Sequence, residues 1–481
     1  MVMRNMLKIR KKEKTAGFEQ NGNPLGTEQI WRLMLRFGIP AIVSMLINAA
    51  YNMIDQVLVG NSVGMLGIAA TNIAFPLTTV SAGISYLLGS GGASNYNLRL
   101  GEGSHEAANT IACNTLSLLA IFGTVIGAAT LIFINPLIFA FGATEAVTPL
   151  ALAYTAIIAI GIPFGIFTTG ACYIIRADGS PRFAMICTVV GAVLNLVVDP
   201  IIAFVLKWGI VGLAWSTTIG QMITAGIAVY YFIRKTKAVS IKKELLWPKL
   251  HMALRICSLG VAPCINQLGA TVVQITMNNT LRYYGAQSVY GSDVPLGSVG
   301  AISKLSVVFM AVTIGIAMGC QPINSFNYGA KQYGRVKKTL RLALISASVV
   351  STAVFVVFQL FPSELIAIFG EKNPLYVEFA ERYLRVFMFM TFVSGIQPVA
   401  ATFFPSIGKA RRGTLIALSR QVLFLVPLLI ILPLFFGMDG VLCAGPVSDF
   451  IAAVISAVLI VTEVRNMSAL QRAQAGIRPA G

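Results

Sequence analysis

The sequence contains little charge for its length. Of its 481 residues only 11% are Asp, Glu, Lys or Arg, whereas soluble domains carry about 25%. Hydrophobic residues make up 56% of the chain, and its mean hydropathy is +0.78. This composition excludes an ordinary water-soluble domain, so we expect a polytopic membrane protein.

Ligands for a transition metal are also scarce. The chain has two histidines, His105 and His251, and its seven cysteines form no Cys-x-x-Cys pair. Zinc sites need such clusters. All seven cysteines fall in apolar segments, where we expect free thiols that behave as small hydrophobic side chains. Because no nucleophile, base and metal ligands cluster in the sequence, we expect neither an enzyme nor a bound cofactor.

Acidic residues are half as numerous as basic ones. The 18 acids and the 36 Lys and Arg residues give a net charge of +18, which in a soluble protein would suggest nucleic-acid binding. Here the basic residues concentrate in loops: segments on the side of the N-terminus hold 29 of them, and the opposite loops hold three. By the positive-inside rule, both termini are expected in the cytoplasm, below the inner (cytoplasmic) membrane, and no nucleic-acid partner is expected.

Long apolar segments dominate the rest of the chain. A helix needs about 20 apolar residues to cross a bilayer. Twelve segments reach that length, six on each side of a charged linker: 37–59, 67–95, 107–134, 149–175, 183–206, 211–233, 256–281, 297–327, 339–360, 378–404, 414–436 and 440–464. We therefore expect an all-α polytopic membrane protein with twelve transmembrane helices in two six-helix bundles.

The two groups of six segments repeat one pattern. Residues 137–142 (LIFAFG) recur as 365–370 (LIAIFG), and Gly209 recurs as Gly437. Since six crossings return the chain to its starting side, the second bundle should be related to the first by a pseudo-two-fold axis along the membrane normal, with a cleft between them. The alternative is a duplication without a shared cavity.

This pattern predicts five parts of the chain. They are a cytoplasmic tail (1–36), a first six-helix bundle (37–235), a cytoplasmic linker (236–255), a second six-helix bundle (256–465) and a second cytoplasmic tail (466–481). The linker places basic residues beside apolar ones, which predicts a short amphipathic helix at the membrane surface.

Few acids lie well inside the apolar segments, and two of them are predicted to meet. At 1.5 Å per residue, Asp55 lies ~27 Å and Asp199 ~24 Å above the cytoplasmic ends of their segments, while Thr217 lies ~9 Å below the outer surface. Asn195 shares a helix face with Asp199 because the two are four residues apart. We therefore expect Asp55, Asn195, Asp199 and Thr217 at one level of the first bundle.

These residue types suit a small cation. Two carboxylates in a low dielectric repel, which strengthens the binding of a proton to one of them. Their oxygens, together with an amide and a hydroxyl, also suit Na⁺, a hard cation. A coupling site for Na⁺ or H⁺ is expected, with the choice of ion left open. The alternative is that Asp199 only hydrogen-bonds to a neighbouring helix.

Substrate contacts are less defined by the sequence. Asp449, the third acid inside a span, is either a carboxylate that faces the substrate or a partner in an internal hydrogen bond. Met277 and Met310 are weaker candidates, because methionine suits variable apolar ligands.

Several of these features together resemble a known family. They are the twelve spans in two repeats, Gly38-Ile39-Pro40 followed by Asp55, the loop Arg176-Ala177-Asp178-Gly179-Ser180-Pro181-Arg182, and Asn195 with Asp199-Pro200. The chain resembles the multidrug and toxic compound extrusion (MATE) family, and most of all its bacterial MepA-type and DinF-type branches. The resemblance implies a V-shaped cleft between two bundles and export of organic cations in exchange for Na⁺ or H⁺. It also implies that the first-bundle residues Asp55, Asn195, Asp199 and Thr217 bind the coupling cation.

The expected protein is thus a monomeric, secondary-active efflux antiporter in the lipid bilayer, which exports small hydrophobic or cationic drugs by alternating access. One alternative shares the architecture but moves lipid-linked saccharides. That function commonly needs a basic cavity, for which Lys304, Arg382 and Arg385 are the candidates in the outer half. A membrane-embedded enzyme is the other alternative, and the sequence offers no clustered catalytic residues for it.

Overall fold

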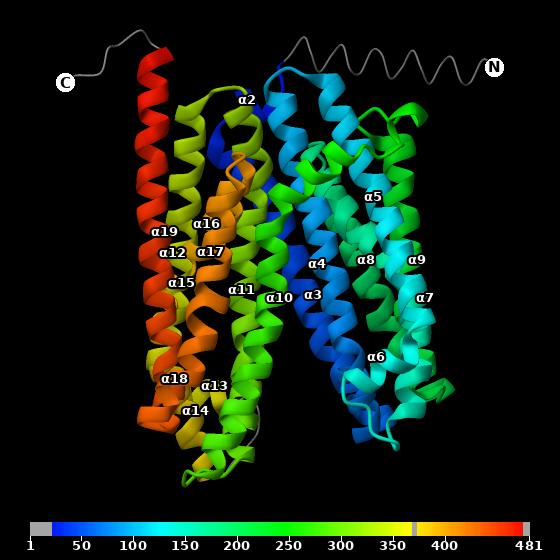
Figure 1. Cartoon of the computed structure of the whole chain (residues 1–481), viewed down its shortest axis with the longest axis vertical. Helices are drawn as coiled ribbons and strands as arrows, with labels where there is room; N and C mark the ends of the chain where they lie inside the picture. Colours follow the sequence, from blue (N-terminus) through cyan, green and yellow to red (C-terminus); the bar gives the residue numbers. More distant parts are fainter. Residues whose placement is uncertain (1–21, 368–372, 475–481) are drawn as a thin grey trace.

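The computed structural model describes residues 22–367 and 373–474, and these residues contain helices but no strand. Eleven helices are long and apolar enough to cross a membrane, and a bent pair of helices makes a twelfth crossing. The prediction of an all-α, twelve-helix membrane protein is confirmed. Both ends of the described chain lie at one end of the molecule, hereafter the terminal end; the opposite end is the far end (Figure 1).

Six crossings form the first half of the chain. They are α3 (Ile30–Val63), α4 (Met65–Gly101), α5 (His105–Ile132), α7 (Thr148–Ala177), α8 (Pro181–Pro200) continued by the π-helix η1 (Ile201–Leu206), and α9 (Gly209–Tyr230) continued by the π-helix η2 (Tyr231–Lys235). Two short helices, α2 (Pro24–Thr27) and α6 (Ile134–Ala140), flank them. Only Gly64 separates α3 from α4, and its φ of +80° explains why glycine occupies this turn.

The second half repeats this order with one difference. Its crossings are α10 (Leu250–Ala286), α11 (Asp293–Gly329), α12 (Tyr333–Leu360), the bent crossing α14 (Pro374–Val386) with α15 (Thr391–Ser394) and α16 (Ile396–Ser406), then α17 (Ala410–Leu418) with η4 (Ser419–Leu425) and α18 (Val426–Phe436), and finally α19 (Met438–Gln474). A short helix, α13 (Pro362–Ala367), precedes α14. The bent crossing turns by 53° and covers the segment predicted over 378–404.

Several helix ends differ from the predicted segment boundaries. Helix α3 begins at Ile30, inside the predicted tail 1–36, and α19 continues to Gln474, inside the predicted tail 466–481. Hydropathy identifies the part of a helix that lies in the membrane core. It does not show where the helix begins or ends, so the predicted segments stop short of the helix ends. In the linker, the predicted amphipathic helix is reduced to the three-residue 3₁₀ turn η3 (Lys243–Leu245). Residues 1–21 and 475–481 of the tails lie outside the described residues.

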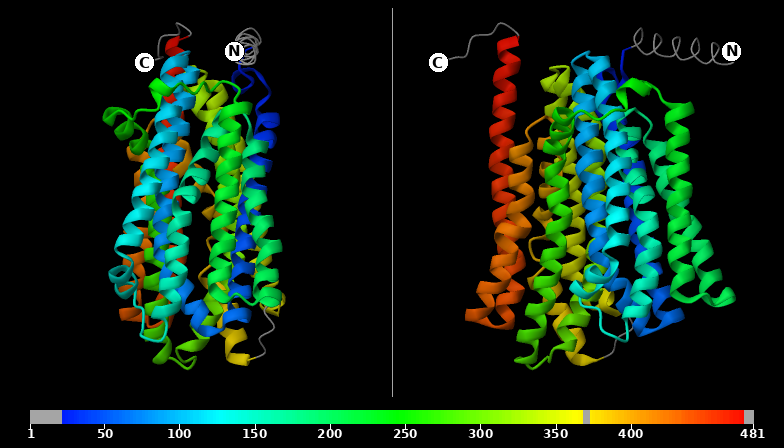
Figure 2. Two further views of the ribbon diagram at one scale, coloured as in Figure 1. Left: turned by 90° about the vertical axis from the view of Figure 1, so that its right-hand side faces the viewer. Right: turned by 45° about the vertical axis from the view of Figure 1, so that its right-hand side comes forward.

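The two halves pack closely through α4 and α10 near the terminal end. A Cβ atom added to Gly260 would overlap the carbonyl oxygen of Leu87, and one added to Gly91 would overlap the carbonyl oxygen of Ile256. Glycine is therefore required at both positions for the backbones to approach this closely. Figure 1 shows the ribbons of the halves side by side here and separating toward the far end, and both views of Figure 2 show the two ends of the described chain at the terminal end.

A polar contact joins the halves in the same region. The side-chain nitrogen of Gln321 in α11 donates hydrogen bonds to the backbone oxygen of Ser90 at 3.1 Å, to the Ser90 hydroxyl at 3.0 Å and to the Ser94 hydroxyl at 2.9 Å. All three residues are buried, so water cannot reach their polar groups and these bonds supply the hydrogen-bond partners they need. Backbone packing and buried hydrogen bonds together close the terminal end.

The linker between the halves is held by the loop that follows α7. The carboxylate of Asp178, which is 3% exposed, accepts hydrogen bonds from the hydroxyl of Tyr231 and from the backbone N–H groups of Lys237, Ala238 and Val239, at 2.7 to 2.9 Å. Burial raises the pKa of Asp178 above its usual value, and the four hydrogen bonds oppose that rise because they favour the charged form.

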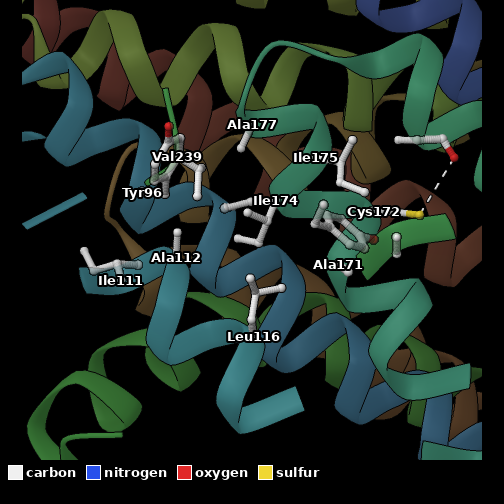
Figure 3. Packing of buried hydrophobic residues seen from close by; sticks show 14 of the residues in the cluster. Tyr96, Ile111, Ala112, Leu116, Ala171, Cys172, Ile174, Ile175, Ala177 and Val239 are labelled. Carbon is white, nitrogen blue, oxygen red and sulfur yellow. Dashed lines mark hydrogen bonds between the residues drawn. The ribbon is translucent and has the colours of Figure 1, made fainter. Parts of the chain in front are cut away.

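Further contacts continue this attachment along the linker. Asn114 of α5 accepts a hydrogen bond from the backbone of Lys249 and donates one to the carbonyl of Leu245. Val239 packs beside Tyr96 in the main buried cluster of the first half (Figure 3). The linker is therefore part of the first half up to the start of α10.

Candidate functional site

The structure brings the two predicted first-half acids together. Asp55 extends from the last third of α3 and Asp199 from the last turn of α8, and their charges are close enough to interact. Asp199 is 1% exposed, whereas Asp55 is partly buried. Like charges in a low dielectric destabilise each other, so this pair needs a bound cation or proton to be stable.

The predicted amide and hydroxyl lie beside the acids. Asn195 is one turn before Asp199, and its side-chain oxygen accepts a hydrogen bond of 3.4 Å from Ser216 of α9. Ser216 is also close enough to interact with the Asp199 carboxylate. Thr217, the next residue of α9, is 3.4 Å from the hydroxyl of Tyr51, which lies one turn before Asp55 on α3. Three helices therefore supply oxygen atoms to one polar cluster.

One carboxylate oxygen of Asp199 remains without a partner. Among the described residues, its Oδ1 atom is buried and makes no hydrogen bond. A buried polar atom left unsatisfied costs about 1–3 kcal/mol, and more when it carries charge. Proton or Na⁺ binding would remove this penalty, because each supplies positive charge at that oxygen.

The helix that carries Asp199 changes its winding directly after the acid. Pro200 has no N–H group to continue the regular hydrogen-bond ladder, and the chain proceeds as the π-helix η1 until Lys207, which adopts a left-handed φ of +53°. Single π-turns inside helices frequently occur at functional sites.

A cavity of about 270 Å³ lies within the first half, next to this cluster. Its wall comes from five helices of the first half, α3, α4, α7, α8 and α9, and from Met318 of α11; it includes Tyr51, Asn195 and Thr217. From there it extends along α7 toward the terminal end and reaches Arg176. The cavity is polar at both ends, so it can hold water or a polar ligand within the bundle.

A smaller cavity of about 120 Å³ lies between the two halves. Asn266 and Gln267 of α10 line it, together with Tyr86, Gln321 and Met318. It shares Tyr86 and Met318 with the larger cavity. These two side chains therefore lie between the larger and the smaller cavity.

Sequence reasoning missed two residues of the polar cluster. Ser216 donates to Asn195 and lies near Asp199, and Tyr154 of α7 lies close enough for its hydroxyl to interact electrostatically with both acids. The depth calculation that located the acids would also have found Tyr154. This residue lies six positions into α7 from the far end, about 9 Å deep, which is the level of Thr217.

The substrate candidates of the second half occupy less accessible places. Asp449 of α19 forms an ion pair of 2.7 Å with Arg420 of η4, which supports the predicted alternative of an internal interaction. Met277 is 5% exposed and belongs to the buried core of the second half, and its contact with substrate stays a prediction. Met310 is partly buried, with its sulfur 4.0 Å from the Thr313 hydroxyl, and stays a candidate.

The donor set favours a hard cation over a transition metal. Within residues 22–367 and 373–474, no three His, Cys, Asp or Glu side chains group to hold a metal ion. The polar cluster offers carboxylate, amide and hydroxyl oxygens, which are ligands for Na⁺ rather than for zinc or copper. These residues fit a single Na⁺ ion or a proton equally well in chemical type.

Twelve crossings in two packed halves, with buried acids and a polar cavity inside one half, define a membrane transporter of the two-bundle class. The MatE family model matches residues 40–201 and 268–431, one stretch in each half, as the internal repeat predicts. The chain belongs to the MatE family. This confirms the family resemblance inferred from the sequence.

Individual relatives agree with this assignment. Multidrug export protein MepA of Staphylococcus aureus (strain MSSA476) is 22% identical over 437 residues, which cover 91% of this chain and 94% of that protein. The protein of the same name from Staphylococcus haemolyticus (strain JCSC1435) is 22% identical over 444 residues, covering 92% and 96%.

Solved structures share the fold. A MOP superfamily transporter from Pyrococcus furiosus, described as having a binding pocket of reverse polarity, superposes with a TM-score of 0.84 at 21% identity, covering 92% of this chain and 98% of that one. An outward-facing multidrug resistance MATE family transporter superposes with a TM-score of 0.85 at 21% identity, again covering 92% of this chain and 98% of that one.

Proposed function

We propose that the protein is a secondary-active antiporter that exports hydrophobic and cationic compounds in exchange for Na⁺ or H⁺. Membership of the MatE family and the names of the MepA relatives support a multidrug exporter. The coupling site is the polar cluster of Asp55, Asn195, Asp199 and Thr217, completed by Ser216.

The observation that carries this proposal is the state of Asp199. Its carboxylate is buried, is close to a second acid and has one oxygen without a hydrogen-bond partner. Such a group binds a proton or Na⁺ strongly when water cannot reach it, and it releases the cation when the surroundings open. A carboxylate kept only for structure would be expected to have both oxygens satisfied.

Coupling follows from the position of this acid. A ligand shifts a conformational equilibrium only by binding one state more tightly than the other. Asp199 lies between the regular helix α8 and the π-helix η1, so a charge change there acts on a segment with two types of backbone hydrogen bonding. Cation binding would favour one packing of the first half and lower the affinity of the cavities for the exported compound.

The orientation of the protein supports an outward-open state. The excess of basic residues places the terminal end in the cytoplasm. Close backbone contacts at Gly91 and Gly260 and the hydrogen bonds of Gln321 close that end. A closed cytoplasmic end with the cation site buried in the first half is the arrangement that we propose for the state entered when external cation has bound.

Export of lipid-linked saccharides is less consistent with the charges at the far end. That function would use free basic side chains, and Arg382 forms an ion pair of 2.6 Å with Asp439. No contact of the described residues favours a pyrophosphate group over a cationic drug.

Efflux from proteoliposomes tests the proposal. A fluorescent organic cation is loaded, and a Na⁺ gradient or a pH gradient is applied to wild type, Asp199→Asn and the control Asp293→Asn, which alters an exposed acid at the start of α11. We expect one gradient to drive efflux in wild type and in the control but not in Asp199→Asn. Normal gradient-driven efflux by Asp199→Asn would overturn the assignment of this residue.

A further inference from the structure

The larger cavity contains a buried positive charge that cation coupling does not use. Arg176, in the last turn of α7, is 8% exposed and lines the cavity at its terminal end. Its Nε donates to the carbonyl of Cys172 at 3.2 Å, and its guanidinium lies 4.6 Å from the centre of the Tyr173 ring.

No acid neutralises this charge among the residues that the structure describes. None of the ion pairs there includes Arg176, and the only hydrogen bond found for its guanidinium comes from Nε. Asp178, two residues later, is committed to the linker backbone. The four N–H groups on the two terminal nitrogens of Arg176 are therefore available to the cavity.

The surroundings of Arg176 suit an anionic group. Hydroxyl-bearing side chains from α4 and α7, Tyr86, Thr169 and Tyr173, line the same cavity and can donate hydrogen bonds. A guanidinium fork matches a carboxylate with two parallel hydrogen bonds, and burial strengthens this interaction. A buried charge without a counterion is costly, which favours occupancy by an anion.

We propose that Arg176 anchors a subsite for the carboxylate of exported compounds. This inference rests on the proposed export function and extends its substrate class from cations to zwitterions. The cavity is bounded at its other end by Asn195 and Thr217, beside the acidic pair. From Cys187, which lines the cavity near Arg176, to Asn195 is eight residues of α8, or about 12 Å. A ligand with a carboxylate and a cationic group about that far apart matches both ends.

A matched pair of probes tests the subsite on the purified full-length protein. Tetramethylrhodamine carries a delocalised cation and a free carboxylate, whereas its methyl ester carries only the cation. Binding of both is measured by fluorescence polarisation for wild type, Arg176→Gln and Arg182→Gln, the last altering an exposed arginine of the same loop. We expect Arg176→Gln to weaken binding of the free acid at least tenfold and that of the ester less than twofold, with Arg182→Gln affecting neither. Unchanged binding of the free acid to Arg176→Gln would overturn the proposal.

A second variant covers the case in which Arg176→Gln does not fold. Arg176→Lys keeps the charge but loses the planar fork. Weaker binding of the free acid with unchanged binding of the ester again supports the subsite, and equal effects on both probes overturn it.

Free anions are another source of the same chemistry. Chloride is therefore added in place of gluconate to protein that has bound the free acid, and release of the free acid is measured. Displacement of the free acid by chloride in wild type but not in Arg176→Gln supports a shared anion subsite at Arg176. If chloride binding depends on Arg176 but binding of the free acid does not, the site binds inorganic anions only. The proposal that Arg176 binds the carboxylate of exported compounds then fails.

Gradient-driven efflux of the methyl ester separates this inference from the proposed function. Efflux of the ester together with Arg176-independent binding of the free acid would reject the subsite alone. Failure of every gradient to move the ester would reject the export function instead.

Discussion

The side-chain amide of Gln321 in α11 donates a 3.0 Å hydrogen bond to the hydroxyl of Ser90 in α4, and this buried contact joins the two halves of the chain. The same nitrogen also reaches Ser94 and the backbone of Ser90. Any conformation that opens the terminal end must break these bonds, because the two helices belong to different halves.

Replacing Gln321 by Ala should therefore favour opening at the terminal end. Each hydrogen bond contributes about 0.5–1.5 kcal/mol, so the variant should shift the conformational equilibrium several-fold. Spin labels on α8 and α12 at the terminal end report the distance between the halves, and we expect a new population at longer distance. The control Gln287→Ala changes an exposed side chain at the end of α10 and should leave the distances unchanged.

Gly260→Ala should have a larger effect, since its methyl group would overlap the Leu87 carbonyl. Overpacking of this kind costs about 1–3 kcal/mol. We expect a lower melting temperature in detergent and weaker closure of the terminal end in the same spin-label measurement. Gly300→Ala on α11 has no atom within 4 Å of the added Cβ and serves as the matched control. Equal melting temperatures of the two variants would contradict the role given to Gly260.

Glu463 is buried in α19 and forms ion pairs with Lys409 and Arg412 of the second half. Glu463→Gln would leave two basic side chains without their carboxylate, and breaking a buried pair costs about 3–5 kcal/mol. The cost here should lie at the lower end of that range, because both basic residues are about one third exposed and solvent screens their charges. Thermal unfolding should show a clear loss of stability, whereas Glu364→Gln, at an exposed position, should behave as wild type.

Asp449 and Arg420 provide a test of the alternative left open by the sequence. If their ion pair is structural, Asp449→Asn and Arg420→Gln should each reduce stability, and the double variant should lose less than the sum. Coupling energies of contacting pairs are about 0.5–3 kcal/mol. A double-mutant cycle on the unfolding temperature, together with drug binding, decides the role. If Asp449→Asn loses drug binding and the added Arg420→Gln change does not restore it, Asp449 instead contacts the substrate.

Asp178→Asn should release the linker from the first half. The amide cannot accept all the hydrogen bonds that the carboxylate accepts from Tyr231 and the linker backbone. Hydrogen exchange of residues 236–240 should become at least tenfold faster, while Glu106→Gln at an exposed site of α5 should leave it unchanged.

The sequence predicted the helices and the acidic pair because both depend on local spacing and on depth. Apolar runs define crossings, and the four-residue interval between Asn195 and Asp199 fixes their shared face. Rotation of one helix against another is not encoded in such patterns. For that reason the sequence does not predict that Arg420 is the partner of Asp449.

Breaks within apolar runs were also beyond the sequence pattern. Residues 387–390, where the tenth crossing bends, are as hydrophobic as the helices around them. Hydropathy also does not separate side chains that face lipid, core or cavity, so the burial of Met277 in the second-half core could not be predicted from the sequence. The free guanidinium of Arg176 could be found only from the positions of its neighbours.

The attachment of the linker to Asp178 affects how the protein can assemble during synthesis. Domains generally fold from the N-terminus while the rest of the chain is still being made. The sixth helix ends at Lys235, yet the carboxylate of Asp178 is satisfied only when residues 237–239 have been added. The first half therefore cannot complete its own interior until the connection to the second half has left the ribosome.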